Sequence, residues 1–304
     1  PLELIYADDN ASANQLFKAA KEGKAIVWQG DYPNGRNMLS ALIRRVNRQS
    51  STGLLKKVST PSEIFHTHRE QQKERAELLA QFLIPISKDF HIQLPRGQDV
   101  YAALALVLEK PETDFLMSLR GLLAIISAYE WYKKGVFISF LKRKITPCFG
   151  VFSPARSEYI DLVAHQEISW PIQTAIEVGV GSGVLSAVLA QRGIQKIFAT
   201  DIDPRAIECA QNNMLTLAYA NQVIILKQSL FPEGVKADLI VCNPPWVPAK
   251  PSSPIENAVF DEDSKFLKAF LLQAVNHLNP GGRVWLILSD LAEHLGLRSR
   301  EELL

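Results

Sequence analysis

An asparagine, two prolines and a tryptophan directly follow a run of aliphatic residues in the stretch DLIVCNPPWVP, residues 238–248. Proline has no N–H and cannot continue a β-ladder, so Pro244 and Pro245 leave the preceding carbonyl groups free to face a ligand. The Asn243 side-chain oxygen and the Pro244 carbonyl are two acceptors, enough for the two N–H groups of a planar amino group. Trp246 adds a flat surface on which a conjugated ring can stack. The alternative is a rigid turn with a tryptophan in the core.

A second group of candidate residues surrounds a glycine-rich turn. The apolar run TAIEV leads into GVGSG, where Gly179, Gly181 and Gly183 allow a sharp turn and a close approach of the backbone to a ligand. The next apolar run, IFATDID, places Asp201 at its end, 22 residues after Gly179. A carboxylate there can bind the hydroxyls of a ribose. The alternative role of Asp201 is to cap the following helix, for which Asp203 is better placed.

The surroundings of this turn favour a cationic ligand over a dinucleotide. Dinucleotide sites commonly have a third glycine, as G-x-G-x-x-G, and place a pyrophosphate at the helix N-terminus. The residues that follow GVGSG do not supply that glycine. Glu177, two residues before Gly179, adds negative charge close to the turn. S-adenosyl-L-methionine carries an ammonium and a sulfonium group but no phosphate, and we therefore expect it as the cofactor.

Apolar periodicity predicts the architecture that positions these residues. Over residues 151–304, short apolar runs alternate with helical spacings, which predicts an α/β fold with a Rossmann-like, doubly wound parallel sheet. Ligands bind such sheets beyond the carboxyl ends of the strands, where the candidate residues fall. Residues 1–150 have mainly helical spacings and predict a mainly helical N-terminal domain, with a possible role in substrate recognition. Two strands joined by a basic turn are expected close to its end.

The three motifs EVGVGSG, ATDIDPRAI and DLIVCNPPW resemble, in their order and spacing, those of class I S-adenosylmethionine-dependent methyltransferases. The resemblance covers residues 150–304. It implies that Glu177 and the glycine turn face the methionine part of the cofactor and that Asp201 binds the ribose. Many relatives have an acid after the third strand that contacts the adenine; Ser229 stands there in this chain. The catalytic motif implied by the resemblance consists of Asn243, which also borders the cofactor, with Pro244, Pro245 and Trp246.

The same resemblance implies a mechanism that depends on alignment. Asn243 and the Pro244 carbonyl would hold the amino group so that its lone pair faces the sulfonium methyl group, with no covalent intermediate and no metal. Sheets of this class have seven strands, whereas five can be read before the chain ends within an apparent helix, REELL. We therefore expect that C-terminal strands are missing from the sequence.

Two substrate classes remain open. GVFSPARSEYIDLV and the GVLS that follows the glycines resemble ribosomal RNA guanine-N2 methyltransferases. EVGVGSGVLSA with TDIDP equally resembles release-factor glutamine methyltransferases. In that family too a P-A-x-x segment precedes the domain, but Arg156 and Ser157 replace the acids expected in that segment. Residues 1–150 carry 21 Lys and Arg against 15 Asp and Glu, and the remainder 12 against 17. This basic first half favours an RNA partner, rRNA or tRNA, over a protein substrate.

Two further alternatives are weaker. An inactive methyltransferase fold that only binds RNA or a partner is disfavoured because Asn243, Asp201 and the glycine turn are all present. A dinucleotide-dependent oxidoreductase does not account for the NPPW stretch. The basic residues 133, 134 and 142–144 form either a phosphate-binding patch or an ordinary solvated turn, and we favour the turn. The long segment 247–263 after Trp246 has the length of a substrate loop.

Composition limits the remaining possibilities. The chain has 304 residues, is 47% hydrophobic and 21% charged, and has the texture of a soluble globular protein. Its three cysteines form no metal-binding spacing, and we expect neither a metal nor a disulfide. No apolar run approaches the length of about 20 residues that a membrane span needs, so no membrane partner and a cytoplasmic location are expected.

Overall fold

The computed structural model describes residues 3–50, 60–251 and 254–303. The chain divides into two compact units, Pro1–Tyr129 and Glu130–Leu304. Over the described residues no helix is both long and apolar enough to cross a membrane. Part of the long segment after Trp246, residues 252 and 253, lies outside the described residues.

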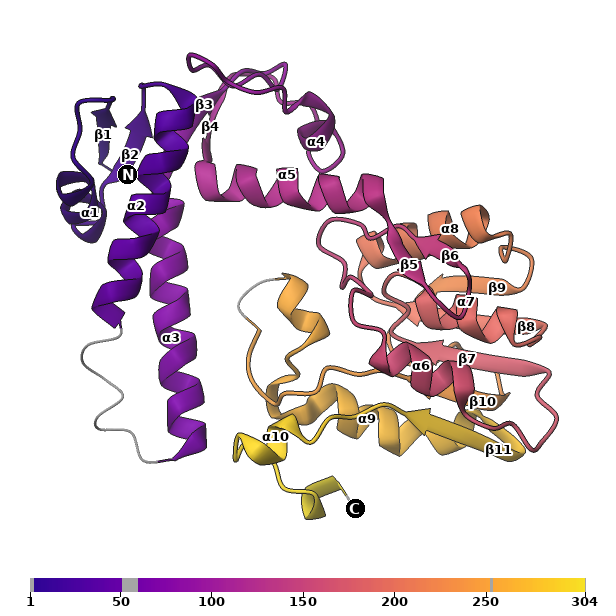
Figure 1. Ribbon diagram of the computed structural model, residues 1–304. Helices are drawn as coiled ribbons and strands as arrows, with labels where there is room; N and C mark the ends of the chain where they lie inside the picture. The colour runs from indigo at the N-terminus through magenta and orange to yellow at the C-terminus, as the bar shows by residue number, and fades with distance from the viewer. Residues whose placement is uncertain (1–2, 51–59, 252–253, 304) are drawn as a thin grey trace. The chain divides into compact units, whose positions relative to one another are not determined.

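The first unit combines helices with a four-stranded sheet (Figure 1). The sheet order is β1-β2-β3-β4, with β1, β2 and β3 parallel and β4 antiparallel to β3. Trp28, Phe82 and Leu42 are among its fully buried side chains. The elements are β1 Leu4–Ala7, α1 Ala13–Lys21, β2 Ala25–Trp28, α2 Tyr32–Ser50, α3 Pro61–Ala80, β3 Phe82–Ile86, α4 Tyr101–Ala105, β4 Phe115–Ser118 and α5 Leu119–Lys134.

This sheet adds strands that the expectation of a mainly helical domain over residues 1–150 did not include. Helical residues still outnumber strand residues, but four short strands were overlooked or merged into helices. The spacing of residues 115–134 is typical of one helix capped by Thr113 or Asp114, but Phe115–Ser118 forms β4. The Asp114 carboxylate instead accepts hydrogen bonds from Lys88 N and Gln93 Nε2, at 2.9 and 2.6 Å, which holds the start of β4 beside β3.

The second unit contains a five-stranded, wholly parallel sheet in the order β11-β10-β7-β8-β9. The predicted α/β architecture and the five predicted strands are confirmed. Because the chain order reverses between β7 and β10, the crevice for a ligand is expected beyond their carboxyl ends. The elements are β5 Val136–Ile138, β6 Arg143–Ile145, α6 Glu158–His165, β7 Thr174–Val178, α7 Val184–Gln191, β8 Lys196–Asp201, α8 Pro204–Leu217, β9 Val223–Lys227, β10 Ala237–Cys242, α9 Lys265–Ala274, β11 Leu278–Leu286 and α10 Leu291–His294.

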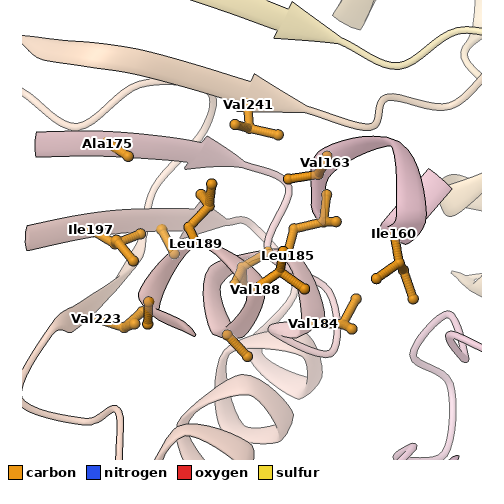
Figure 2. Packing of buried hydrophobic residues seen from close by; sticks show 14 of the residues in the cluster. Ile160, Val163, Ala175, Val184, Leu185, Val188, Leu189, Ile197, Val223 and Val241 are labelled. Atoms are coloured by element: carbon orange, nitrogen blue, oxygen red, sulfur yellow. The ribbon is translucent and has the colours of Figure 1, made fainter. Parts of the chain in front are cut away.

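Helices α6 and α7 pack onto the sheet through aliphatic side chains, as Figure 2 shows. Val163 on α6 and Leu185 and Val188 on α7 are buried with Ala175 and Ile197 of the strands. Every residue of α7 from Val184 to Ala190 is buried. This burial explains why nearly all of these residues are apolar. The helix that follows the glycine turn is therefore held rigidly by the core.

The antiparallel hairpin of β5 and β6 belongs to the second unit, so the division of the chain falls near residue 130 and not at 150. Ile138, Leu141 and Ile145 are buried in the same core cluster as α7. A boundary between compact units depends on which core the apolar side chains join, and periodicity does not report this.

Candidate functional site

Four neighbouring strands bring the predicted residues to one edge of the sheet. Gly179 follows β7, Asp201 ends β8, Ser229 follows β9 and Asn243 follows β10. These strands are adjacent in the order β10-β7-β8-β9 and all parallel, so their carboxyl ends lie at the same edge. The predicted site residues are thus gathered by strand topology, although they span 65 residues of sequence from Gly179 to Asn243.

The glycine turn adopts the backbone conformation for which glycine was expected. Gly179, Gly181 and Gly183 have φ values of +83°, +50° and +80°. A Cβ built on Gly179 or Gly181 would meet no atom within 4 Å, so open space lies beside them. On Gly183 it would lie 3.0 Å from Met214 Cε and 3.2 Å from Ala210 Cβ. The first two glycines therefore leave room for a ligand, and Gly183 permits close packing of α8.

Asp201 joins the end of β8 to this turn. Its Oδ2 accepts a hydrogen bond from Gly181 N at 3.1 Å, and its Oδ1 accepts one from Asp203 N at 3.0 Å. Asp203, and not Asp201, caps α8, because its side chain accepts from Arg205 N at 2.9 Å. The half-buried Asp201 carboxylate retains further lone pairs for a ligand.

Glu177 is buried within β7, with 2% of its surface exposed. Ser186 Oγ on α7 donates a hydrogen bond to its Oε2. Burial raises the pKa of Glu177 to about 8, and the charge of Asp201 acts in the same direction. Near neutral pH the folded chain therefore holds this carboxyl mainly in its protonated form. The negative charge expected beside the glycine turn is largely suppressed in the free protein.

Asn243 and Trp246 contact each other directly. The Trp246 indole N–H is shared between Asn243 Oδ1 and the Ile287 carbonyl, both at 3.1 Å. This contact orients the Asn243 amide and uses one of the two lone pairs of its oxygen. Trp246 is half-buried against the main core cluster, so only part of its ring remains for stacking. Among the described residues, no protein donor reaches the Pro244 carbonyl.

Ser229 is exposed in the bend after β9, at the position predicted for the adenine contact. The backbone there is linked to the site because Gln228 N donates to the Asp201 carbonyl at 2.9 Å. Ile202, which follows Asp201, was not among the predicted site residues and is 67% exposed. The exposed Ile202 side chain is an apolar surface directly beside the Asp201 carboxylate.

Asn213 is a second residue of the site that was not predicted from the sequence. It is 2% exposed on α8, and its Nδ2 donates to the Ser182 carbonyl within the glycine turn at 2.9 Å. Its amide also exchanges two hydrogen bonds with Thr146, with Thr146 N donating to Oδ1 at 2.9 Å and Nδ2 donating to Thr146 O at 3.0 Å. Asn213 therefore ties the turn to the segment that follows β6. Its position on the apolar face of α8, with Ala210 and Leu217, is the signal that could have revealed it.

Arg298 supports the NPPW segment from the C-terminal part of the chain. It is 7% exposed and donates to the Trp246 carbonyl at 3.4 Å and to Ser264 Oγ at 3.0 Å. Its Nε has no hydrogen-bond partner. Nothing in the local sequence signals this role, because it depends on a contact between residues 52 positions apart.

No group of three or more His, Cys, Asp or Glu side chains among the described residues is arranged to hold a metal ion. The cysteines Cys148, Cys209 and Cys242 are all free thiols.

Comparison with known proteins places the second unit among methyltransferases. The family model described as "Methyltransferase small domain" matches residues 144–299. A putative protein N5-glutamine methyltransferase of Methanocaldococcus jannaschii is 32% identical over 51% of this chain and 79% of its own length. A release factor glutamine methyltransferase of Moorella thermoacetica is 31% identical, over 53% of this chain and 64% of its own.

RNA-modifying proteins are also similar to this chain. A tRNA1(Val) (adenine(37)-N6)-methyltransferase of Porphyromonas gingivalis is 28% identical over 38% of this chain and 49% of its own length.

Among solved structures, a ribosomal protein L11 methylase from Lactobacillus delbrueckii subsp. bulgaricus is 24% identical, over 49% of this chain and 69% of its own, with a TM-score of 0.38.

Replacing Asn213 with alanine should lower the free energy of unfolding by about 2–4 kcal/mol, because buried backbone groups of Thr146 and Ser182 lose their partners. Denaturant unfolding measures this. The matched control is Asn212→Ala, which removes an exposed asparagine from the same helix and should change stability by less than about 0.5 kcal/mol. Equal effects of the two substitutions would contradict the tethering role.

Glu177→Gln should flatten the dependence of stability on pH. The pKa of Glu177 is 4.5 when unperturbed and about 8 in the folded chain. Between these values the unfolded state has lost the proton that the folded state keeps, so the stability of the wild type falls as pH rises, by at most about 1.4 kcal/mol per pH unit from this group. Unfolding free energies from pH 5 to pH 8 test this. Parallel curves for wild type and variant would show that Glu177 is ionised in the folded chain.

Proposed function

The chain belongs to the methyltransferase small domain family, a family of class I methyltransferases, and from this premise we propose that it transfers a methyl group from S-adenosylmethionine to the amino nitrogen of a planar group. The acceptor we propose first is an exocyclic base amine of rRNA or tRNA. The observation that carries the proposal is the pair of acceptors after β10, the Asn243 side-chain oxygen and the Pro244 carbonyl, to which no donor among the described residues binds.

The residues at the sheet edge fit the cofactor in shape and in chemistry. Gly179 and Gly181 border open space, so the turn can accept a ligand close to its backbone. The Asp201 carboxylate, at the end of the neighbouring strand, retains lone pairs for the two ribose hydroxyls. Exposed Ile202 offers apolar surface to the adenine, with Ser229 as a polar neighbour. S-adenosylmethionine, when bound, supplies a methyl group on a sulfonium, which is an excellent leaving group.

Glu177 gives the site a means of responding to a cation. Its carboxyl is held neutral by burial, so a nearby ammonium would favour ionisation and release a proton. Ser186 Oγ could still donate its hydrogen bond to the ionised Glu177 carboxylate and would stabilise it. We therefore propose that Glu177 acquires its charge only when the cationic end of the cofactor lies beside it.

Asn243 and Pro244 position the acceptor in this proposal. The lone pair of an amino nitrogen conjugated to a ring is delocalised, so the nitrogen is weakly nucleophilic. The protein must therefore align this nitrogen accurately with the methyl group. One N–H would donate to the remaining lone pair of Asn243 Oδ1, whose orientation Trp246 Nε1 maintains. The other N–H would donate to the Pro244 carbonyl. Asn243 accepts without ionising, so its role is orientation and not proton abstraction. As the C–N bond forms and the C–S bond breaks, the methylated nitrogen becomes positively charged, and it would lose its extra proton to solvent after the transfer.

The exposed part of Trp246 would carry the ring of the acceptor. Reaching it requires a base that is single-stranded or turned out of a helix. Arg298 donates to the Trp246 carbonyl, and the Ile287 carbonyl accepts from the Trp246 indole N–H. The ring is therefore held in place before the acceptor binds. The basic balance of residues 1–150 supports RNA as the partner that brings the base.

A protein glutamine is the second candidate acceptor. The similarity to the putative N5-glutamine methyltransferase, at 32% identity, and to the release factor enzyme, at 31%, favours it. A glutamine side-chain amide is planar and carries an NH₂ group, so the same pair of acceptors would serve. Radiolabelled methyl transfer into extract of cells that lack the gene separates the candidates: label removed by nuclease supports RNA, and label removed by protease supports glutamine. Absence of transfer into either fraction would contradict the proposed function.

Asp201→Ala and Asn243→Ala should separate cofactor binding from turnover. The first should weaken S-adenosylmethionine affinity by about tenfold or more, because it removes a charged hydrogen-bond acceptor. The second should reduce kcat by on the order of 10²–10³-fold while leaving that affinity within a few-fold of wild type. Calorimetry and methyl-transfer kinetics measure the two effects. Unchanged affinity in the first variant refutes the ribose role, and retained turnover in the second refutes the positioning of the amine.

A further inference from the structure

The β5–β6 hairpin and the last turn of α5 present a group of exposed basic and aromatic side chains that the proposed site does not use. We call it the hairpin surface and define it as Trp131, Lys134, Phe137, Lys142 and Lys144. All five are exposed. They lie in the second unit, the one that contains the glycine turn.

The segment that carries this surface is basic, and the acid directly before it, Glu130, pairs with Lys133 at 2.8 Å. Residues 131–157 contain six Lys and Arg and no Asp or Glu. Lys134 and Lys144 lie close together, because Lys144 Nζ donates to the Lys134 carbonyl at 2.8 Å. Cations gathered without acids from their own segment repel one another, and an anionic partner would relieve this repulsion.

The aromatic residues distinguish this surface from a simple solvated turn. Trp131 and Phe137 are 48% and 59% exposed. In the hairpin register Phe137 lies directly opposite Lys144, so both project from the same, outward face. Lys134 Nζ lies 5.3 Å from the centre of the Trp131 ring. Exposed aromatic rings do not help to solvate a charged turn. Lysines and aromatic rings side by side can instead contact the phosphates and the bases of a nucleic acid strand.

The inner face of the hairpin holds this surface rigidly on the methyltransferase unit. Ile138 and Ile145 are buried in the main core cluster. The Arg143 guanidinium donates to the Leu217 carbonyl at the end of α8 at 2.7 Å. The outward residues are therefore fixed in space relative to the core and do not depend on a mobile loop.

The hairpin is also joined to the glycine turn. Thr146, the first residue after β6, pairs with the Asn213 amide, which in turn donates to the Ser182 carbonyl. Two hydrogen-bonded steps thus connect the end of β6 to the turn proposed to hold the cofactor. A partner on the hairpin surface would be held at a constant position relative to the turn.

We propose that the hairpin surface binds the backbone and unpaired bases of a single-stranded RNA segment next to the methylated nucleotide. The lysines would contact phosphates, and Phe137 and Trp131 would stack on bases. Single-stranded RNA is favoured over a duplex because the exposed rings require unstacked bases. This inference rests on the proposed function in that it assigns the RNA class of substrate to the same unit.

The test measures binding of a labelled single-stranded RNA 20-mer of mixed sequence to the full chain, by fluorescence anisotropy over a series of salt concentrations. Lys142→Gln/Lys144→Gln should weaken binding and reduce the slope of log K against log salt by about 1.4, since each phosphate contact contributes about 0.7. The control is Lys196→Gln/Lys236→Gln, which removes the same charge at the amino ends of β8 and β10, the opposite edge from the glycine turn. It should leave the slope nearly unchanged.

Phe137→Ser should weaken binding by about tenfold without altering the salt slope, because it removes stacking and no charge. All variants should retain the wild-type affinity for S-adenosylmethionine in calorimetry. Equal losses in the hairpin and control variants, or an unchanged affinity in both hairpin variants, would overturn the inference. Wild type that binds the cofactor but no single-stranded RNA would overturn it too and leave the methyltransferase proposal standing. RNA binding through the hairpin without cofactor binding would support the RNA-binding role of the hairpin surface while refuting the methyltransferase proposal.

Discussion

The hydrogen bond from Gly181 N to the Asp201 carboxylate is the interaction on which the candidate site depends. It joins the turn after β7 to the end of β8, two strands that are neighbours in the sheet. A backbone N–H bound to a carboxylate is stronger than one bound to a neutral acceptor, and this one is half-buried. Gly179 N and Val180 N add two bonds to the Thr200 carbonyl, both of 2.9 Å. The conformation of the turn is therefore established before any ligand binds. Gly179 and Gly181 lie on the side of the turn that borders open space.

A second set of contacts shapes the acceptor side of the site. Trp246 binds Asn243 and the Ile287 carbonyl through one indole N–H, so the ends of β10 and β11 are held together by the motif itself. Ile287 N also donates to the Cys242 carbonyl at 2.9 Å. In the proposed reaction the chain contributes little beyond orientation. Rigid placement of Asn243 is then what the surrounding structure supplies, and a one-ångström displacement would be costly.

The sequence was sufficient to predict the parallel sheet and the gathering of the candidate residues at one of its edges, because both follow from local patterns. Gly179, Asp201 and Asn243 each directly follow or end a strand, and parallel strands bring such ends together. The sheet of the first unit escaped prediction because LIYA, AIVW and FLMS are four-residue apolar runs, too short for periodicity to separate strand from helix. The roles of the positioning residues Asn213 and Arg298 could not be predicted, because both residues act through contacts with residues distant in the sequence. The protonated state of Glu177 escaped because it results from burial, which a spacing argument does not measure.

The central claim is that the turn Gly179–Gly183 and the Asp201 carboxylate together hold S-adenosylmethionine. A crystal structure of the full chain with S-adenosylhomocysteine, the demethylated product, tests it most directly. The account predicts the amino-acid part of this ligand beside the glycine turn and both ribose hydroxyls within hydrogen-bonding distance of Asp201. A ligand bound elsewhere, or an Asp201 carboxylate that still contacts only Gly181 and Asp203, would contradict it.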